Sequence, residues 1–428
     1  MEILKLNGRN EDRSSSRGPQ ARPSLPFLPE FSSGEDLPEW LLEEILIRLP
    51  LSSVFRLRCV SQGWHLRLFH PFFRRRYVSL RAKFPPSWTL LYGYTRAVED
   101  VPGSTRWDHR SIGNAAPPRF TVLPSRSSHG RVRFLGCSNG LLLCCQRWKE
   151  LYYVYNPLTL QWLSLPRGFP WTEPTREGLI TRLEGDELRS YKVVQVGQEP
   201  ESPAELSVDV FSSETGLWTY YRFCSPQPDH FPKPFPYFRF ARAVTVKETV
   251  YLPDYREGVL MAYSPYTSPD QLSIVRLPDH ELGRLPEWFK LCDGFGEKLR
   301  YYTVSEAWED PKLEVWELAD PSNGGKWGLL HACRWVEIRP EDDCVDVSTL
   351  HRGFHPLCFH PSDPGIVYLW NVKCIASYDM KARSLGVFCE LDGSFRGLSW
   401  DSVLPFELPN WPVSIPRYPE KEFHVHCN

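Results

Sequence analysis

The densest group of metal-ligating side chains in this 428-residue sequence lies between residues 351 and 360. Its members are His351, His355, Cys358 and His360. Histidines four residues apart would share one face of a helix and could bind a metal ion together. Gly353 and Pro356 disfavour a helix here, so we interpret these histidines as hydrogen-bonded loop residues and predict no metal site.

Other reactive side chains do not form a recognisable catalytic pattern. Cys144 and Cys145 are adjacent on a predicted strand, so they face opposite sides and cannot easily share a zinc ion. The sequence contains no G-x-S-x-G motif and no phosphate-binding G-x-x-x-x-G-K-[ST] motif. The acidic run Glu341–Asp343 is interpreted as solvated charge in a polar loop. We therefore predict no catalytic residue, no metal and no cofactor, and a protein that is not an enzyme.

The charge balance excludes a strongly basic protein. Fifty Lys and Arg against 52 Asp and Glu give a net charge of −2, so no overall field favours nucleic acid or an anionic membrane. The segment 231–240, FPKPFPYFRF, has many aromatic residues but only two basic ones, too few for a nucleic-acid surface. Its Phe235, Tyr237 and Phe238 are candidate anchors for a protein substrate, since proline stiffens the loop. Alternatively, these rings pack onto the rest of the fold.

The cellular compartment is predicted from the first residues, the length of the apolar runs and the spacing of the cysteines. The first ten residues become polar too early for a secretory leader, and no apolar run reaches the roughly 20 residues that span a bilayer. The 12 cysteines follow no regular framework and are expected to be reduced thiols. We therefore predict no membrane partner and a location in the cytoplasm, the nucleus or both.

A strongly apolar segment, residues 37–73, has the spacing of three short helices. Pro38 suits a first helical position, Ser52 or Ser53 could cap the second helix, Ser61 could cap the third, and Pro71 would end it. About forty residues are near the lower size limit for independent folding and cannot bury so many large apolar side chains. The excess surface should contact either the rest of the chain or another protein.

This segment resembles the F-box family. The resemblance rests on Leu37-Pro38, Leu42, Glu44-Ile45-Leu46, Arg48-Leu49-Pro50, Arg56, Arg58-Cys59-Val60-Ser61, Trp64, His70-Pro71 and Phe73. Trp40 and Ser61-Gln62 depart from the usual pattern without removing an apolar anchor. The resemblance covers about a tenth of the chain and implies binding to the Skp adaptor of cullin-based ubiquitin ligases. The residues expected to form the box core and this contact are Leu37, Pro38, Leu42, Ile45, Leu46, Leu49, Pro50, Val54, Leu57, Val60 and Trp64.

Beyond Arg76, the sequence alternates short β-rich runs with turn residues and shows no long amphipathic helix. A unit recurs in which a strand ending in an aromatic residue leads through a polar turn to Trp162, Trp218, Ile274, Trp327 or Val387. These positions are 53 to 60 residues apart, which is typical of one four-stranded propeller blade per repeat. The aromatic side chains are expected to pack between blades. Trp107 is a weaker sixth match that lacks a clean strand, and together the matches predict six blades.

The start of this β-rich region also resembles the F-box-associated, Kelch-like propeller of plant F-box proteins. The similarity rests on Ser138-Asn139-Gly140-Leu141-Leu142, Tyr155-Asn156-Pro157 and Trp162-Leu163-Ser164-Leu165-Pro166. The tail containing Phe406, Leu408 and Trp411 is expected either to add a strand to the first blade or to cap the ring.

The sequence therefore predicts a mainly β protein with a small α domain. Residues 1–34 form a disordered arm, 35–76 a three-helix F-box, and 77–428 a six-bladed propeller. The resemblance implies the substrate-recognition subunit of an SCF (Skp–cullin–F-box) ubiquitin ligase, which binds Skp, through it cullin, and an unknown target protein. Two alternatives stay open: a small-ligand receptor or enzyme built on the propeller, and a non-degradative scaffold such as a transcriptional co-regulator.

Overall fold

The computed structural model divides into two compact units, one ending at Phe73 and the other beginning at Arg74. The structure describes residues 39–49, 51–57, 60, 62–83, 88–97, 105–112, 132–146, 151–159, 161–168, 176–185, 187–199, 202–224, 242–255, 258–278, 291–295, 297–304, 312–321, 325–341, 354–360, 363–371, 373–390, 403–411 and 413–419. The predicted arm, 1–34, and the predicted substrate loop with Phe235, Tyr237 and Phe238 lie outside these residues. None of the helices described has the length and hydropathy of a membrane-spanning segment.

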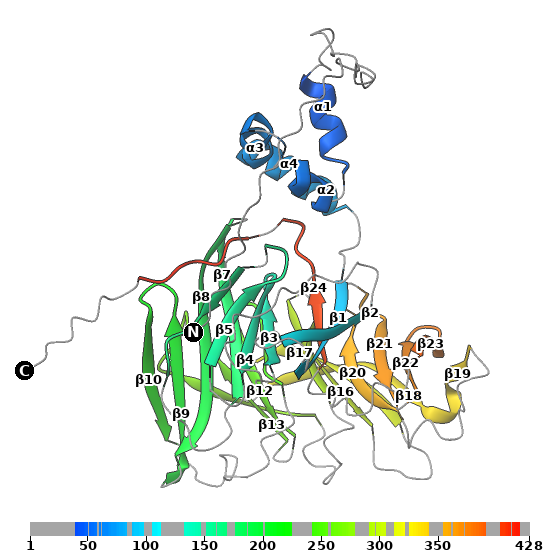
Figure 1. Ribbon diagram of the computed structural model, residues 1–428. Helices are drawn as coiled ribbons and strands as arrows, with labels where there is room; N and C mark the ends of the chain where they lie inside the picture. The colour runs from blue at the N-terminus through cyan, green and yellow to red at the C-terminus, as the bar shows by residue number, and fades with distance from the viewer. Residues whose placement is uncertain are drawn as a thin grey trace, which may run out of the picture. The chain divides into compact units, whose positions relative to one another are not determined.

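The first unit is helical, as the apolar spacing predicts (Figure 1). Its helices are α1 (Glu39–Leu46), α2 (Leu51–Leu57), α3 (Gln62–Phe69) and the beginning of α4 (Pro71–Arg81). Leu46, Ile47, Val54, Leu68 and Phe73 are buried and form its core.

Two predictions about these helices are wrong. Ser52 and Ser53 lie inside α2, which begins at Leu51, so neither is its cap. The third helix ends at Phe69, before Pro71, as predicted, but Pro71 also begins a fourth helix, α4, where three helices were predicted. Proline is favoured at a first helical position because the missing N–H would have no intrahelical partner there. Pro71 therefore both follows the end of α3 and begins α4.

The second unit contains six antiparallel sheets, one of which gains a parallel edge strand. In order round the unit they are β24 (Val403–Glu407), β1 (Trp88–Ala97) and β2 (Thr105–Ile112); β3 (Val132–Ser138), β4 (Leu141–Gln146), β5 (Leu151–Asn156) and β6 (Gln161–Ser164); β7 (Arg176–Glu184), β8 (Glu187–Glu199), β9 (Ser202–Ser212) and β10 (Leu217–Cys224); β11 (Val244–Val246), β12 (Thr249–Asp254), β13 (Val259–Tyr263) and β14 (Leu272–Arg276); β15 (Leu291–Phe295), β16 (Lys298–Val304), β17 (Lys312–Asp320) and β18 (Lys326–Arg334); and β20 (His355–Phe359), β21 (Ile366–Trp370), β22 (Cys374–Asp379), β23 (Ser384–Glu390) and β19 (Arg339–Pro340).

The first strand of each sheet in this order contacts the first strand of the next, so the six inner strands close into a ring. The contacts run from β24 to β3, β7, β11, β15 and β20, and back to β24. The ring is closed by pairing between the two ends of the unit, because the C-terminal strand β24 pairs with β1, with Leu91 opposite Leu404. Phe406 lies in β24, so the tail adds a strand to the first blade as one of the two alternatives predicts. The unit is therefore a β-propeller.

The described residues form five complete blades of at least four strands, where the sequence predicts six. The sheet at the sixth place, β24-β1-β2, has three described strands. Trp107 was expected to lack a clean strand. This expectation is wrong, because Trp107 lies in β2. Trp107 is in the third strand from the ring, whereas the other repeat positions lie in fourth strands, which explains its weaker match to the period.

The repeated aromatic residues join neighbouring blades, as predicted. Trp218 in β10 donates its indole N–H to the carbonyl of Pro166, which follows the preceding blade, at 2.9 Å. Trp327 in β18 makes the equivalent hydrogen bond to the carbonyl of Arg276, at 2.7 Å. A buried indole N–H needs an acceptor, and the chain leaving the previous blade supplies it. These tryptophans therefore fix the spacing of successive blades.

The propeller has no single central core. Its buried apolar residues form six clusters, each made by two neighbouring sheets, over the part of the chain that the structure describes. Both faces of a blade are therefore buried: Val208 in β9 packs toward the fourth sheet, and Phe211 packs toward the second. Cys144 and Cys145 likewise enter different clusters, which agrees with their predicted opposite directions.

After β24, the C-terminal segment 409–419, which we call the C-terminal strap, crosses two further blades (red in Figure 1). Asn156 binds the carbonyl of Val413, and the Tyr418 hydroxyl donates to the carbonyl of Ser164 at 2.7 Å. Tyr418 also meets the ring of Phe211 edge-on, with centroids 5.3 Å apart. The strap therefore ties the first, second and third blades together, beyond the strand pairing that closes the ring.

Candidate functional site

The helical unit exposes a large apolar surface. Six of the twelve exposed large hydrophobic side chains in the described residues belong to it: Trp40, Ile45, Val60, Leu66, Phe69 and Phe72. The unit accounts for a small part of the described chain, so this concentration is far above that of the propeller. Isolated exposed apolar residues are ordinary, but a group of this size on a small unit is typical of a protein-binding surface.

The residues predicted for this surface divide into three groups. Ile45 and Val60 are 44% and 67% exposed and are available to a partner. Leu46 and Val54 are buried at 2% and 1% and hold the unit together. Intermediate exposure is found for Leu42, Leu49, Leu57 and Trp64. The remaining three, Leu37, Pro38 and Pro50, lie outside the described residues.

Sequence spacing alone could not separate inward from outward positions in such short helices. Ile45 and Leu46 are neighbours in α1, yet one is exposed and the other buried. The sequence prediction also omitted Leu66, Phe69 and Phe72, which are exposed beside the predicted set. The available signal was the presence of a leucine and two phenylalanines in a basic helical stretch.

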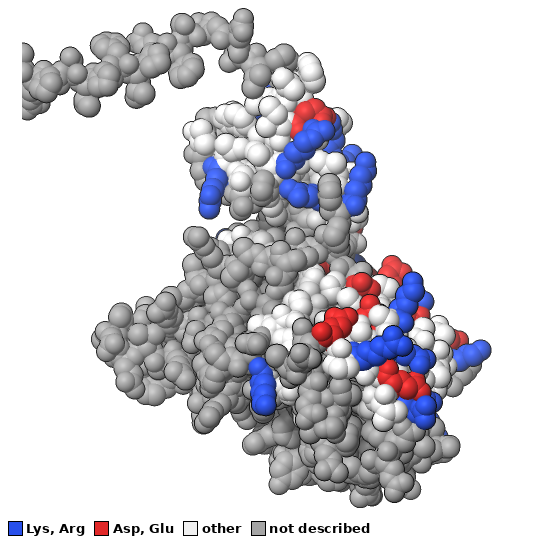
Figure 2. All heavy atoms as spheres, turned by 90° about the vertical axis from the view of Figure 1, so that its right-hand side faces the viewer, with Lys and Arg blue, Asp and Glu red and all other residues white. Residues whose placement is uncertain are grey.

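The propeller carries acidic and basic side chains interspersed on the face shown in Figure 2. Among them, Glu337 pairs with both Arg334 and Arg383, at 2.7 and 2.6 Å. These exposed pairs add little stability. Among the described residues of this face, side chains of the two signs alternate and form no extended surface of one sign.

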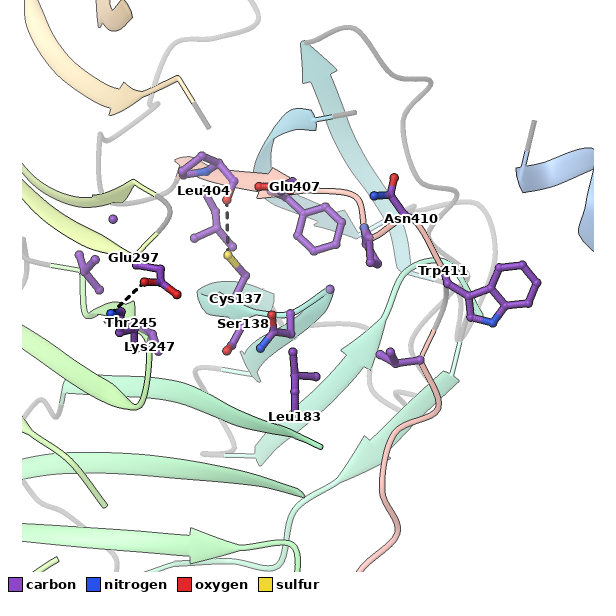
Figure 3. Close-up of a pocket in the computed structure, with 18 of the residues that line it drawn as sticks. Cys137, Ser138, Leu183, Thr245, Lys247, Glu297, Leu404, Glu407, Asn410 and Trp411 are labelled. Carbon is purple, nitrogen blue, oxygen red and sulfur yellow. Dashed lines mark hydrogen bonds and ion pairs between the residues drawn. The ribbon is translucent and has the colours of Figure 1, made fainter. Parts of the chain in front are cut away.

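A pocket of about 660 Å³ opens at one mouth of the propeller ring (Figure 3). It lies at the end of the ring where β3, β7, β11, β15 and β20 turn back into the second strands of their blades and where β24 ends. All six blades contribute through the turns or ends of their inner strands, and the C-terminal strap and α4 form part of the wall. The lining includes Ser138, Leu183, Lys247, Glu297, Glu407 and Asn410.

Local turn chemistry shapes this mouth. Asn139 and Gly140 have positive φ values of 45° and 78° in the β3–β4 turn, and Lys247 has a φ of 52° in the β11–β12 turn. Gly140 is also required by space, because a Cβ there would lie 2.6 Å from Pro409 of the C-terminal strap. The Thr181 hydroxyl lies 2.7 Å from both the Ser138 hydroxyl and the Asn139 amide nitrogen, which fixes this part of the rim.

The two acidic side chains in the pocket differ in their surroundings. Glu297 forms an ion pair with Lys247 at 2.9 Å. Glu407, the last residue of β24, has no ion pair or side-chain hydrogen bond in the described structure. Glu407 is an exposed residue, yet partial desolvation at the pocket wall raises the pKa of its carboxyl. Glu407 is therefore a carboxylate whose lost hydration nothing in the described chain replaces.

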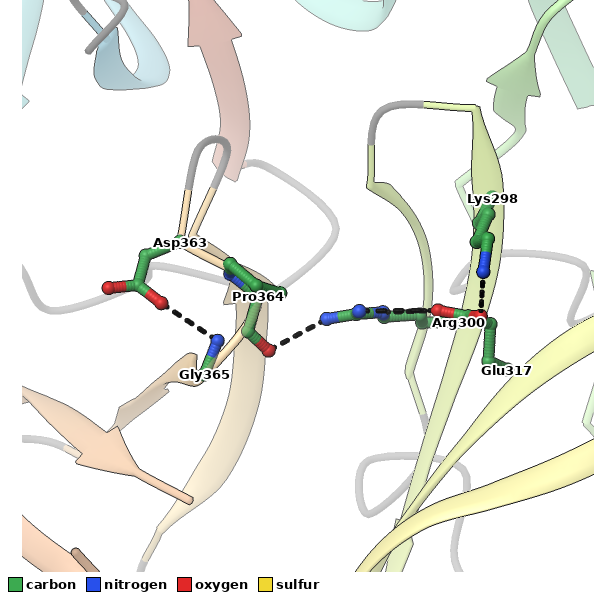
Figure 4. A network of polar contacts seen from close by, with 6 residues as sticks. All are labelled: Lys298, Arg300, Glu317, Asp363, Pro364 and Gly365. Carbon is green, nitrogen blue, oxygen red and sulfur yellow. Dashed lines mark hydrogen bonds and ion pairs between the residues drawn. The ribbon is translucent and has the colours of Figure 1, made fainter. Parts of the chain in front are cut away.

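A third acid, Glu317, shows how the same protein satisfies a buried carboxylate (Figure 4). Burial would raise the pKa of Glu317, but hydrogen bonds and charge from Lys298 and Arg300 hold it below its usual value. Arg300 also donates to the carbonyl of Pro364 in the next blade, at 2.8 Å. This network joins the fifth and sixth blades and is structural, in contrast to the uncompensated Glu407.

The histidine group at residues 351–360 does not form a metal site in the described part of the chain. His355 and Cys358 lie in strand β20 instead of the predicted loop, and Cys358 is buried. The His360 ring packs edge-on against Trp88, with centroids 4.8 Å apart, and its Nδ1 accepts the backbone N–H of Asp363. His351 lies outside the described residues. The described members of this group therefore pack within the fold or stabilise a turn.

A helical F-box with an apolar surface, followed by a β-propeller, defines the class of protein. The F-box domain model matches residues 35–69. The model of the family "F-box protein At3g26010-like, beta-propeller" matches residues 86–401, so the chain belongs to this family of F-box proteins.

Curated relatives in Arabidopsis thaliana share this organisation along most of their length. The chain is 27% identical over 412 residues to the F-box protein At3g26010, covering 89% of this chain and 90% of the relative. It is 28% identical over 426 residues to the putative F-box/kelch-repeat protein At4g22430, covering 90% and 94%. A third relative, the putative F-box/kelch-repeat protein At1g15680, is 27% identical over 429 residues, covering 90% and 95%.

Proposed function

We propose that this protein is the substrate-recognition subunit of an SCF-type ubiquitin ligase. Its F-box binds the Skp adaptor and, through it, the cullin, while its propeller binds the target protein. Ubiquitin transfer is carried out by other subunits, so this chain supplies proximity and orientation and no catalytic group. We place this activity in the cytoplasm or nucleus, in keeping with the cysteines of the described residues, which are all free thiols.

The observation that carries this proposal is the exposed apolar surface of a unit that matches the F-box model. Ile45 and Val60 are proposed as direct contacts with the adaptor, and Leu66, Phe69 and Phe72 are added to them. Leu46 and Val54 act indirectly by holding the helices in place. The contacts of Leu37, Pro38 and Pro50 stay predictions from the resemblance.

The test is co-purification of the full chain with the Skp adaptor. We expect Ile45→Asp and Val60→Asp each to weaken adaptor binding at least about tenfold, because each places a charge in an apolar interface. Leu329→Asp, which changes an equally exposed leucine on β18 of the propeller, is the matched control and should bind normally. Normal adaptor binding by both Ile45→Asp and Val60→Asp would contradict the proposed interface.

The second half of the proposal concerns the propeller. Removing residues 35–69 from the chain should cause target proteins to accumulate in cells. These target proteins should still bind the propeller. Adaptor binding without any change in the abundance of propeller-bound proteins would instead favour the non-degradative scaffold.

A further inference from the structure

The pocket at the propeller mouth contains one charge that the described protein does not match. Glu407 lies on the pocket wall at the end of β24 (Figure 3). It faces a cavity of about 660 Å³, a size within the range of pockets that hold small molecules or a few side chains. A partly desolvated carboxylate gains most from a ligand that brings a positive charge and N–H donors.

The basic residues round the pocket do not serve this role. Lys247 is paired with Glu297, and Arg74 pairs with Glu187 at 3.3 Å. Arg242 is engaged in an interaction of its own. Burial is the cause of the raised pKa of Glu407, and no basic group offsets it. The described lining carries three basic and two acidic side chains, and because the basic ones are engaged elsewhere, its preference for a ligand is set locally, at Glu407.

Apolar lining next to these charges suits the stem of a long basic side chain. Leu183 is 45% exposed at the end of β7 and lines the pocket, as does Phe359. Lysine and arginine combine an aliphatic stem with a charged head, and they commonly lay the stem along apolar surface. An acidic side chain would be repelled by Glu407, and a short neutral polar one would leave the apolar lining uncovered.

We propose that this pocket binds a lysine or arginine side chain on an exposed segment of the target protein, with Glu407 as its counter-ion. This inference rests on the proposed function and names the chemistry that the propeller recognises. A protein segment fits better than a free amine because Ser138, Asn139 and Asn410 add hydroxyl and amide groups at the rim. Such groups can hydrogen-bond the main chain on either side of the bound residue.

The test uses the full-length protein and four labelled hexapeptides with blocked ends, Gly-Ser-Leu-X-Gly-Ser, in which X is Lys, Arg, Gln or Glu. Binding is measured by fluorescence anisotropy at low and at physiological salt. We expect the Lys and Arg peptides to bind at least about tenfold more tightly than the Gln peptide, the scale of one charge-assisted hydrogen bond. The Glu peptide should bind most weakly.

Two variants decide whether Glu407 is responsible. Glu407→Gln should remove the preference for Lys and Arg, whereas Glu297→Gln, which changes the paired acid of the same pocket, should retain it. Thermal melting of both variants establishes that the propeller is folded. Equal binding of all four peptides, no binding of any, or a preference that survives Glu407→Gln would overturn the proposal. Displacement of the Lys peptide by an equal concentration of n-butylammonium would assign the pocket to free amines and also overturn it.

Adaptor binding by the same preparations separates this inference from the proposed function. If the Skp adaptor binds and no peptide preference is found, only the pocket assignment fails. If the adaptor does not bind and the Lys preference depends on Glu407, the SCF role fails and the protein is a receptor for basic segments in another setting.

Discussion

The helical unit and the propeller differ in how completely they bury their apolar side chains. In the propeller, second-strand residues such as Leu142, Val193 and Leu252 are fully buried between neighbouring blades. In the helical unit, six large apolar side chains stay exposed within a few short helices. The propeller buries these side chains within its own ring, whereas the helical unit leaves an apolar surface on which we propose that the adaptor binds. The difference shows that a closed ring satisfies its own surfaces, whereas a small helical unit of this composition cannot.

The largest expected effect is at the core of the helical unit. Leu46→Asp buries an unpaired charge in place of a side chain that is 2% exposed, and should destabilise this unit by about 4 kcal/mol. We expect loss of helical circular dichroism and of adaptor binding, with an unchanged melting transition of the propeller. A propeller transition that fell in parallel would show that the two units unfold as one, and the comparison would fail.

The next effect is at the joint between the fifth and sixth blades. Arg300→Met should destabilise the propeller by about 3 kcal/mol, because it leaves Glu317 buried with one fewer cation and removes the bond to Pro364. Lys298→Met changes the solvent-exposed partner of Glu317 and should cost less than about 1 kcal/mol. Denaturant unfolding of the propeller measures both, and equal losses would show that Arg300 has no special role.

The same pair predicts a pH dependence. The pKa of Glu317 is lower in the folded protein, so its stabilisation is present above the usual value of 4.5 and is lost as the pH falls through the folded value. Arg300→Met should therefore make the loss of propeller stability in acid shallower than in the wild type.

A smaller effect is expected in the C-terminal strap. Ile415 is buried against the second and third blades, and Ile415→Ala should destabilise the propeller by about 2 kcal/mol. Arg417→Ala, an exposed position in the same segment, is the matched control and should melt like the wild type. If Ile415→Ala also melts normally, the strap would lie on the surface without stabilising the ring.

The smallest effect is at Glu407. Its ionised form destabilises the folded protein, whereas ionised Glu317 stabilises it. The folded pKa of Glu407 is raised, so ionised Glu407 opposes folding above its unfolded value, and this penalty disappears as the pH falls below about 4.5. Glu407→Gln should therefore raise the melting temperature slightly at pH 7 and leave it unchanged at pH 4. A lower melting temperature at pH 7 would mean that Glu407 has a stabilising partner after all.

Much of this fold could be predicted locally. The spacing of Trp162, Trp218 and Trp327 predicts the repeat, because each occupies the fourth strand of a blade, and Trp218 and Trp327 bind the chain that leaves the previous blade. Gly216 in the β9–β10 turn has a positive φ of 70°, a conformation that glycine adopts without strain and that can be read from the local sequence. The fourth helix was missed because Pro71 is compatible with both a helix end and a helix start.

The sequence by itself determined what depends on neighbours in the chain: short apolar helices, strands with their turns, and the period of the blades. Only the tertiary structure decided which of Ile45 and Leu46 faces outward, which strand closes the ring, and which acid is left without a cation. Glu407 has no distinguishing sequence signal, since part of its surroundings comes from residues more than a hundred positions away, among them Ser138 and Leu183. Burial and charge compensation are properties of contacts between distant segments, and closure of the ring creates those contacts.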